Sequence, residues 1–345
     1  YTGWYTLSLH DALPICSEPF NCTGFFSIPF AATGLPPSIV LGTDQGAFAS
    51  SDGVQFAAMA RMAVSPAAND FALVAAPGAS PELLVAGGFG VGAISPSNLA
   101  ANASWSDRSG PASVAAGGSN ARLNNAAATD VAVLGATVFA SVVTNHYRDV
   151  LASADGGATW STTGISAVLN PLDEPSRMVA DGANGVLYVA TTQGLLAYSP
   201  AASRWTAVGA TTIGSVSSLA LGAQHVYAGT DAGLFAVPLG TSPAGAVPVA
   251  AGLSALAIKA LLVSGGNVYA ATFDELSGTH AVSTAAEPAV AAGTATWAEF
   301  GISPVGPNRV TSLLRVGDTL LAGTNGGLVR YATATSPWSS ANVSS

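Results

Sequence analysis

One pattern recurs along almost the whole of this 345-residue chain. It consists of an apolar run with a small residue at its centre, a tight turn that usually contains Gly, and a second apolar run. The seven copies are IVLGTDQGAFAS (39–50), LLVAGGFGVGAI (83–94), TVFASVV (137–143), LYVATTQGLLAY (187–198), VYAGTDAGLFAV (226–237), VYAATFDEL (268–276) and LLAGTNGGLVRY (320–331). A repeated unit must bury its apolar faces against its neighbours, so the repeat constrains the fold more than any single motif.

The spacing of the copies predicts the architecture. Successive small residues are 45, 54, 49, 39, 42 and 52 positions apart, and they are Gly42, Gly87, Ser141, Ala190, Gly229, Ala271 and Gly323. Blades of β-propellers repeat about every 40–50 residues. The sequence therefore predicts an all-β protein, a single seven-bladed β-propeller of four-stranded blades over residues 17–345, with six or eight blades as alternatives.

Each repeat also contains the further strands that a blade needs. Apolar runs precede the small residue, as in 216–221 and 310–316, and a fourth segment often carries Trp, namely Trp105, Trp160, Trp205, Trp297 and Trp338. No stretch of about twelve residues holds a sustained helical period, so little helix is expected. Turns such as TDAG and TNGG place Gly where a hairpin needs a positive φ.

Charge and composition exclude several classes of function. Charged residues make up 8% of the chain and the net charge is −9, so a nucleic-acid partner is not expected. The longest uncharged stretch, 232–258, contains three Pro and several Gly and does not resemble a membrane span. The sequence lacks Cys and His residues at metal-ligand spacing and lacks a phosphate-binding Gly-rich loop, so we expect no metal and no cofactor. We also expect the protein to be a monomer.

The first residues do not resemble the rest of the chain. Residues 6–15, TLSLHDALPI, resemble one reading frame of a sequencing adapter, and the chain begins with Tyr1 rather than Met. We therefore expect residues 1–16 to be artefactual or disordered, with a native amphipathic segment as the alternative. Pairing of Cys16 with Cys22 stays open.

A family resemblance rests on residues 153–160, which read SADGGATW. This segment resembles the Asp box, or bacterial neuraminidase repeat, with the pattern S-x-D-G-G-x-T-W. A degenerate copy at 50–56 has Ser51, Asp52, Gly53 and Phe56 as its marks. In that sialidase-like superfamily the box is structural, which implies that Asp155 accepts backbone hydrogen bonds in the turn. The resemblance assigns the same structural role to Ser153, Gly156, Gly157, Thr159 and Trp160.

The resemblance also raises the question of glycoside hydrolysis. Sialidases with Asp boxes carry an arginine in an F/Y-R-I-P segment, whereas residues 26–29 here read Phe-Ser-Ile-Pro. Serine cannot replace the planar, bidentate guanidinium that clamps a carboxylate. Relatives that cleave xyloglucan use a pair of carboxylates instead, and spacing alone does not show which Asp residues converge. No catalytic residue is assigned; a sialidase-like or xyloglucan-active hydrolase remains the alternative to a non-enzymatic binding protein.

The candidate binding surface lies where the innermost strands begin. Aligning the repeats predicts a ring of charged residues around the mouth of the central channel: Asp70, Asp130, Arg177, Lys259 and Arg309. Two longer loops on the same face, 144–149 and 272–280, add His146, Tyr147, Arg148, Phe273, Asp274 and Glu275. The sequence thus favours an exported protein, extracellular or periplasmic, that binds a protein or a glycan at this face.

Deleting residues 1–16 tests the interpretation of the N-terminal segment. If the segment takes no part in the fold, its removal changes the melting temperature by no more than about a degree. A fall of several degrees, equivalent to more than about 1 kcal/mol in a protein of this size, would identify the segment as native structure.

Overall fold

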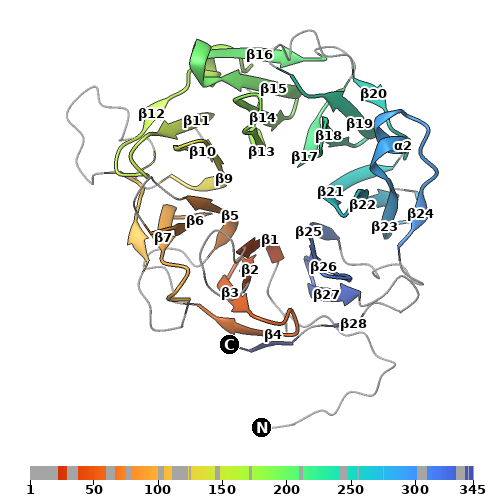
Figure 1. The fold of residues 1–345 in the computed structure, drawn as a ribbon, viewed down its shortest axis with the longest axis horizontal. Coiled ribbons are helices and arrows are strands. Elements are labelled where there is room, and N and C mark those ends of the chain that lie inside the picture. Colours follow the sequence, from red (N-terminus) through yellow and green to blue (C-terminus); the bar gives the residue numbers. More distant parts are fainter. Residues whose placement is uncertain are drawn as a thin grey trace.

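Seven antiparallel sheets surround a central axis in the computed structural model, as Figure 1 shows. The first four strands of each sheet come from one contiguous stretch of chain, and the first of them lies nearest the axis. The prediction of a seven-bladed propeller is confirmed. The structure describes residues 22–28, 38–59, 67–74, 80–99, 105–110, 123, 126–143, 148–170, 173–209, 213–240, 248–254, 256–274, 276–300, 309–331, 339–340 and 342–344.

The strands fall into blades as follows. Blade 1 holds β1 (Cys22–Ile28), β2 (Ser38–Thr43), β3 (Gly46–Ser50) and β4 (Gln55–Ala58); blade 2 holds β5 (Ala68–Val74), β6 (Glu82–Gly87), β7 (Gly90–Ile94) and β8 (Ser106–Asp107); blade 3 holds β9 (Ala128–Leu134), β10 (Thr137–Val143), β11 (Arg148–Ser153) and β12 (Ser161–Thr162). Blade 4 holds β13 (Pro175–Asp181), β14 (Val186–Thr191), β15 (Gly194–Ser199) and β16 (Arg204–Val208); blade 5 holds β17 (Val216–Leu221), β18 (His225–Thr230), β19 (Gly233–Pro238) and β20 (Val249–Ala250). Blade 6 holds β21 (Ala257–Ser264), β22 (Asn267–Asp274), β23 (Thr279–Ala286) and β24 (Ala298–Glu299); blade 7 holds β25 (Val310–Val316), β26 (Thr319–Thr324), β27 (Gly327–Tyr331) and β28 (Ser339–Ser340).

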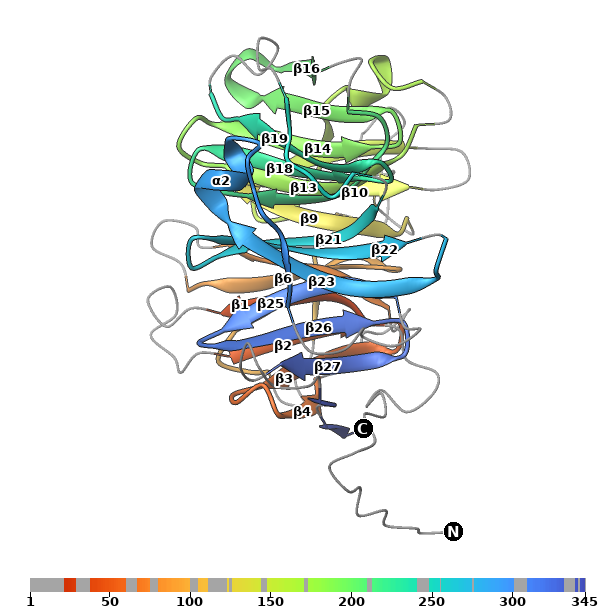
Figure 2. The same cartoon turned by 90° about the vertical axis from the view of Figure 1, so that its right-hand side faces the viewer.

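Helical structure is sparse in the described part of the chain, as the sequence predicts. It comprises the 3-10 turns η2 (Ile165–Ala167) and η3 (Pro200–Ala202) and the short helix α2 (Glu287–Ala291). Figure 2 shows the ring edge-on, with α2 and the β22–β23 turn at opposite faces. We call the face where the inner strands begin the mouth face, and the opposite one the far face. None of the helices in the described ranges is long and apolar enough to cross a membrane.

The second strand of each blade carries the small residue that marks the repeat, and the structure shows why it is small. A Cβ added at Gly229 of β18 would lie 2.3 Å from the Oγ of Ser218 and 2.7 Å from a methyl of Ile258 in the next blade. Neighbouring sheets therefore approach each other too closely near the axis for a larger side chain. The second strands are almost fully buried because both of their faces are covered, which explains their nearly continuous apolar sequence.

The core is divided into seven apolar clusters, one at each interface between neighbouring blades. The interface between blades 3 and 4, for example, joins Phe139, Val150 and Ile165 to Leu187 and Tyr198. Because each cluster takes residues from two sheets, no blade buries its apolar surface alone. This is the physical reason why the fold is a closed ring of repeats.

Tryptophans link the blades near their outer edges. The indole Nε1 of Trp160 in blade 3 donates to the carbonyl of Arg108 in blade 2 at 2.7 Å. Trp205 in blade 4 donates in the same way to Thr163 of blade 3 at 3.0 Å, and Trp297 in blade 6 donates to Ala251 of blade 5 at 3.0 Å. Each of these side chains thus reaches back to the preceding blade. The Trp in the fourth segment of the repeat is an interface residue.

The last described strand, β29 (Asn342–Ser344), pairs in parallel with β4 and becomes the fifth strand of blade 1. Blade 7 is complete without it, since β25 to β28 form a four-stranded sheet of their own. The ends of the ring are therefore joined in two ways: by the apolar cluster between blades 7 and 1, and by this outer strand pairing.

The turn at 153–160 lies on the far face and is closed by its own side chains. The carboxylate of Asp155 accepts hydrogen bonds from the hydroxyl of Ser153 at 2.7 Å and from the amide of Thr159 at 2.8 Å. Gly157 donates to Ser153 Oγ at 2.8 Å and has a φ of 95°. Partial burial raises the pKa of the Asp155 carboxyl, but the hydrogen bonds from Thr159 and Ser153 outweigh it and hold the pKa below its ordinary 3.8.

A similar turn closes β3 and β4. Asp52 accepts hydrogen bonds from the amides of Val54 at 2.8 Å and Gln55 at 2.9 Å, and these lower the pKa of its carboxyl. The serine that bonds to Asp52 is Ser50, at 2.9 Å, rather than Ser51. The S-x-D spacing, read from Ser50, gives this assignment directly.

Replacing Asp155 by Ala removes an acceptor that holds the turn together. We expect Asp155→Ala to lower the free energy of unfolding by about 1–3 kcal/mol in chemical denaturation at pH 7. Because the pKa is lowered in the folded state, the stabilisation is complete above about pH 4 and is lost as the pH falls through and below 3.8. Asp318→Ala, at a carboxylate that is 95% exposed, is the control and should change stability by less than about 0.5 kcal/mol. Equal stability of the two variants would contradict the role of Asp155.

Candidate functional site

A β-bulge interrupts the inner strand of every blade close to the mouth face. The register between first and second strands shifts at the same place in all seven sheets. The residues that the strand register skips include Asn69, Thr129, Ser217, Lys259 and Thr311. A bulge turns an additional side chain out of the strand's regular alternation. This is how seven apolar sheets present polar groups around one axis.

Below the bulges, the inner strands of blades 2 to 7 enclose a cavity of about 210 Å³, which we call the channel cavity. Four residues of the ring predicted from the sequence line it: Asp70, Asp130, Arg177 and Lys259. Leucines from three of the blades, Leu219, Leu261 and Leu313, line it as well. These residues do not occupy equivalent positions in their strands. Lys259 lies at a bulge, whereas Asp70 and Asp130 each come one residue after a bulge.

Asp130 is the most buried charged group of the channel cavity, with 2% of its surface exposed. Its Oδ2 accepts a hydrogen bond from the amide of Met178 in the next blade at 2.8 Å, and the carboxyl of Asp70 from the preceding blade is its neighbour in the channel cavity. Asp70 repeats the arrangement one blade earlier, accepting from the amide of Val131 at 3.3 Å. Burial raises the pKa of Asp130 well above its ordinary range, the neighbouring Asp70 raises it further, and Arg177 acts in the opposite sense.

The channel cavity opens at the mouth face into a wider hollow of about 600 Å³, the mouth recess. Arg177 and Thr311 line both, so the two hollows are adjacent. Arg309, the fifth residue of the predicted ring, lies in the mouth recess. The remaining lining residues are Asn69, Thr129, Val143, Glu174, Pro175, Ser176, Ser217 and Asn325.

Several charges near the mouth are neutralised by a neighbour. Lys259 donates to Asp231 of the preceding blade at 2.6 Å, and Arg148 bonds to Glu174 of the following blade at 2.8 Å. Arg148 therefore ties two blades together. On the same side of blade 6, burial lowers the pKa of His280, and the nearby Arg309 and Lys259 lower it further.

The loop predicted at 272–280 is shorter than the sequence suggests, and of the loop predicted at 144–149 the structure describes Arg148 and Asp149, which begin β11. Residues 272–274 end β22 and 279–280 begin β23, and Phe273 stacks on His280 across this pair with the ring centroids 4.5 Å apart. Asp274 accepts hydrogen bonds from Leu276 and Ser277, which lower the pKa of its carboxyl. Both hydrogen bonds are local, so they hold the Asp274 side chain against its own turn. His146, Tyr147 and Glu275 lie outside the described residues.

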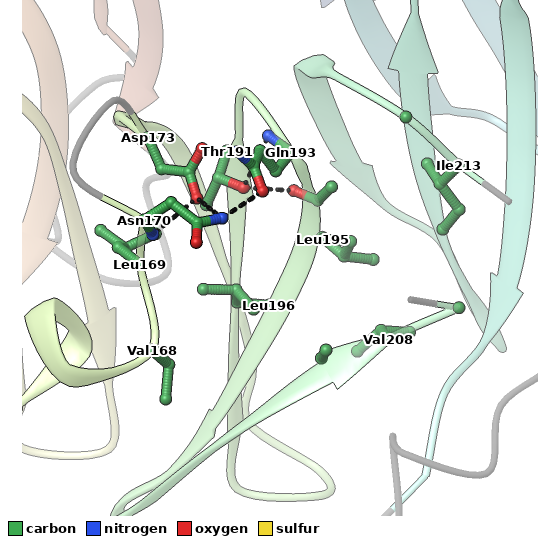
Figure 3. Close-up of a pocket in the computed structure, with 14 residues that line it drawn as sticks. Val168, Leu169, Asn170, Asp173, Thr191, Gln193, Leu195, Leu196, Val208 and Ile213 are labelled. Atoms are coloured by element: carbon green, nitrogen blue, oxygen red, sulfur yellow. Dashed lines mark hydrogen bonds between the residues drawn. The ribbon is translucent and has the colours of Figure 1, made fainter. Parts of the chain in front are cut away.

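A separate pocket of about 160 Å³ lies at the mouth-face end of blade 4, away from the axis (Figure 3). Its walls are mainly aliphatic, including Leu195, Leu196 and Ile213. Its one acidic group, Asp173, is 3% exposed and accepts hydrogen bonds from Asn170 at 2.9 Å and Thr192 at 3.2 Å. Both carboxylate oxygens of Asp173 already accept a hydrogen bond from the protein. This pocket therefore presents fewer charged groups to a ligand than the mouth recess does.

The fold and the site define a seven-bladed β-propeller with a polar recess at the mouth of its channel. No family model matches the chain, and no curated protein matches its sequence. Among solved structures, the chain is similar to the extracellular domain of BT4673 from B. thetaiotaomicron, assigned to a hybrid two-component system, with a TM-score of 0.66 and 14% identity. That match covers 93% of this chain and 39% of the other, so the chain spans about two fifths of its length.

Two further structures are similar over most of both chains. The WD40 repeats of RRP9 match with a TM-score of 0.58 and 12% identity, covering 90% of this chain and 92% of that one. YCF48 bound to a D1 peptide matches with a TM-score of 0.50 and 12% identity, covering 82% and 86%. At such low identity these likenesses show the propeller fold alone.

The state of Asp130 can be tested by its pH dependence. Its folded-state pKa is raised above the ordinary 3.8, so the unfolded chain releases the proton first and the wild-type protein loses stability as the pH rises above about 4. Asp130→Asn cannot titrate, and its amide oxygen can still accept from Met178. We expect the variant to gain stability relative to wild type between pH 4 and 7 in denaturant titrations. A difference that does not change with pH would show that Asp130 is ionised in the folded protein.

Proposed function

We propose that this chain is a non-enzymatic binding propeller that holds a protein or glycan ligand in the mouth recess. The observation that carries the proposal is the convergence of polar and charged side chains from blades 2, 3, 4, 5 and 7 on the mouth recess. Loops and strand ends on a rigid scaffold are the usual place for a binding surface. The protein acts as a monomer and without a cofactor.

In this proposal the protein is located in the extracellular space or the periplasm. The similarity to an extracellular domain supports this, as does the low charge of the chain. The YCF48 structure, which holds a peptide, offers a precedent for ligand binding on a propeller of this general shape.

The chain belongs, in this proposal, to the Asp-box propellers of the sialidase-like superfamily. Support comes from the turn at 153–160, where the Ser, Asp, Gly and Thr of the S-x-D-G-G-x-T-W pattern bond to one another. Trp160 is 2% exposed and packs against the preceding blade. The turn lies on the far face, so its role is to shape the blade, and ligand binding belongs to the opposite side.

Glycoside hydrolysis finds less support. Two catalytic carboxyl groups flank a scissile bond with a separation of about 5–10 Å, so that a sugar ring fits between them. Asp70 is instead close enough to Asp130 to raise the pKa of its carboxyl, and Asp130 is buried. A buried carboxyl beside another carboxyl does not flank an open groove.

Blocking the mouth recess tests the proposal. Ser176→Trp places an indole in the recess at a side chain with a single long hydrogen bond of 3.4 Å. Ala183→Trp adds the same group at an exposed position on the far face and is the matched control. In screens on immobilised glycans and peptides, we expect ligands of the wild-type protein to be lost with Ser176→Trp and kept with Ala183→Trp. Ligands unaffected by either change, or turnover of a glycan that persists in Ser176→Trp, would contradict the proposal.

A further inference from the structure

Cationic side chains are scarce in this protein, and four of the eight that the structure describes form side-chain ion pairs. The chain has ten Lys and Arg residues against nineteen Asp and Glu. Side-chain ion pairs join Arg108 to Glu82, Arg148 to Glu174, Lys259 to Asp231 and Arg315 to Asp318. In a chain with such an excess of acid, a guanidinium without a carboxylate partner stands out.

Arg177 and Arg309 are such groups. Neither side chain makes a hydrogen bond or ion pair with the described part of the chain, although Arg177 is half-buried and lies near Asp130. They come from blades 4 and 7, which are not neighbours in the ring, yet both line the mouth recess. The hydrogen-bonding capacity of two guanidiniums is thus directed into one open space.

The other polar groups of the recess are largely committed to the fold. Asn69 donates to the carbonyl of Ala128 at 2.9 Å, Ser217 donates to that of Ile258 at 2.7 Å, and Thr311 donates to that of Gly323 at 3.1 Å. Glu174, the acidic residue of the recess, is bonded to Arg148. Among the described residues of the recess, the charged donors left for a ligand are therefore those of the two arginines.

We infer that the mouth recess captures an acidic peptide, whose carboxylates are held by Arg177 and Arg309. This inference rests on the proposed function and names its ligand. A guanidinium binds a carboxylate through two parallel hydrogen bonds, and a partly desolvated one binds it more strongly. The interaction replaces water at groups that the fold has left without a partner.

The lining of the recess favours a peptide over a sugar. Its described residues include no aromatic side chain on which a sugar ring could lie. Val143 and Pro175 add apolar surface beside Arg177, which suits aliphatic side chains between the acidic ones. The net charge of −9 repels an acidic peptide from the rest of the molecule, so binding should be confined to the mouth.

The test uses fluorescence anisotropy with a fluorescein-labelled, C-terminally amidated nonapeptide of alternating Glu and Val. Three variants of the full chain each remove one positive charge: Arg177→Gln, Arg309→Gln and the control Arg204→Gln. Arg204 lies exposed on β16, the outer strand of the blade that carries Arg177, and also makes no ion pair with a described residue. We expect the first two variants to weaken binding on the order of tenfold and the control to stay within about twofold of wild type. Thermal melts confirm that each variant is folded.

Two further peptides and an oligosaccharide test which feature of the ligand the recess recognises. A peptide with Gln in place of Glu should not bind, and binding should weaken as salt is raised. A peptide with a free C-terminus shows whether a terminal carboxylate is preferred to side-chain ones, and an oligosaccharide of uronic acids tests the alternative ligand class. Equal losses with Arg204→Gln, binding of the Gln peptide, no binding of the acidic peptide, or arginine-dependent binding of the oligosaccharide alone would each overturn the inference. Binding of another ligand that Ser176→Trp abolishes and Arg177→Gln leaves intact would preserve the proposed function while this inference fails.

Discussion

The close approach of neighbouring sheets near the axis is the constraint on which the rest of this structure depends. A blade has two apolar faces, and each face is covered only by the next blade in the ring. The second strand must therefore carry a small residue such as Gly229, beside which Ile258 of the next blade leaves no room for a Cβ. Packing of this kind links all seven sheets, since the loss of one interface exposes apolar surface on two blades.

The same approach determines the polarity of the channel. At the inner edge, backbone groups of one blade meet side chains of another, and Asp70 and Asp130 accept hydrogen bonds from the amides of the following blade. At the outer edge, Trp160, Trp205 and Trp297 reach back to carbonyls of the preceding blade. Buried polar groups are expensive unless they are paired, so the fold uses most of its polar side chains for itself. The polar groups that remain unused, above all the guanidiniums of Arg177 and Arg309, are those on which binding can depend.

Much of this architecture could be predicted from the sequence because the repeat carries it. Seven small residues at a spacing near 47 gave the number of blades, and the turn residues gave the hairpins. The inner-strand bulges could not be predicted in the same way, since a bulge adds one residue without changing the apolar pattern. Aligning the repeats therefore places Asp70 and Asp130 level with Lys259, whereas the structure places them one position further along. The closeness of these two carboxyl groups in adjacent blades depends on that position, and so does the lining of the recess by Asn69.

Because every blade is encoded by one contiguous stretch of chain, the ring has no blade that depends on both termini for its four strands. The sheets are in this sense interchangeable modules arranged in a circle. A circular permutation that joins the present ends and opens the chain in any linker between blades would keep all seven four-stranded sheets whole.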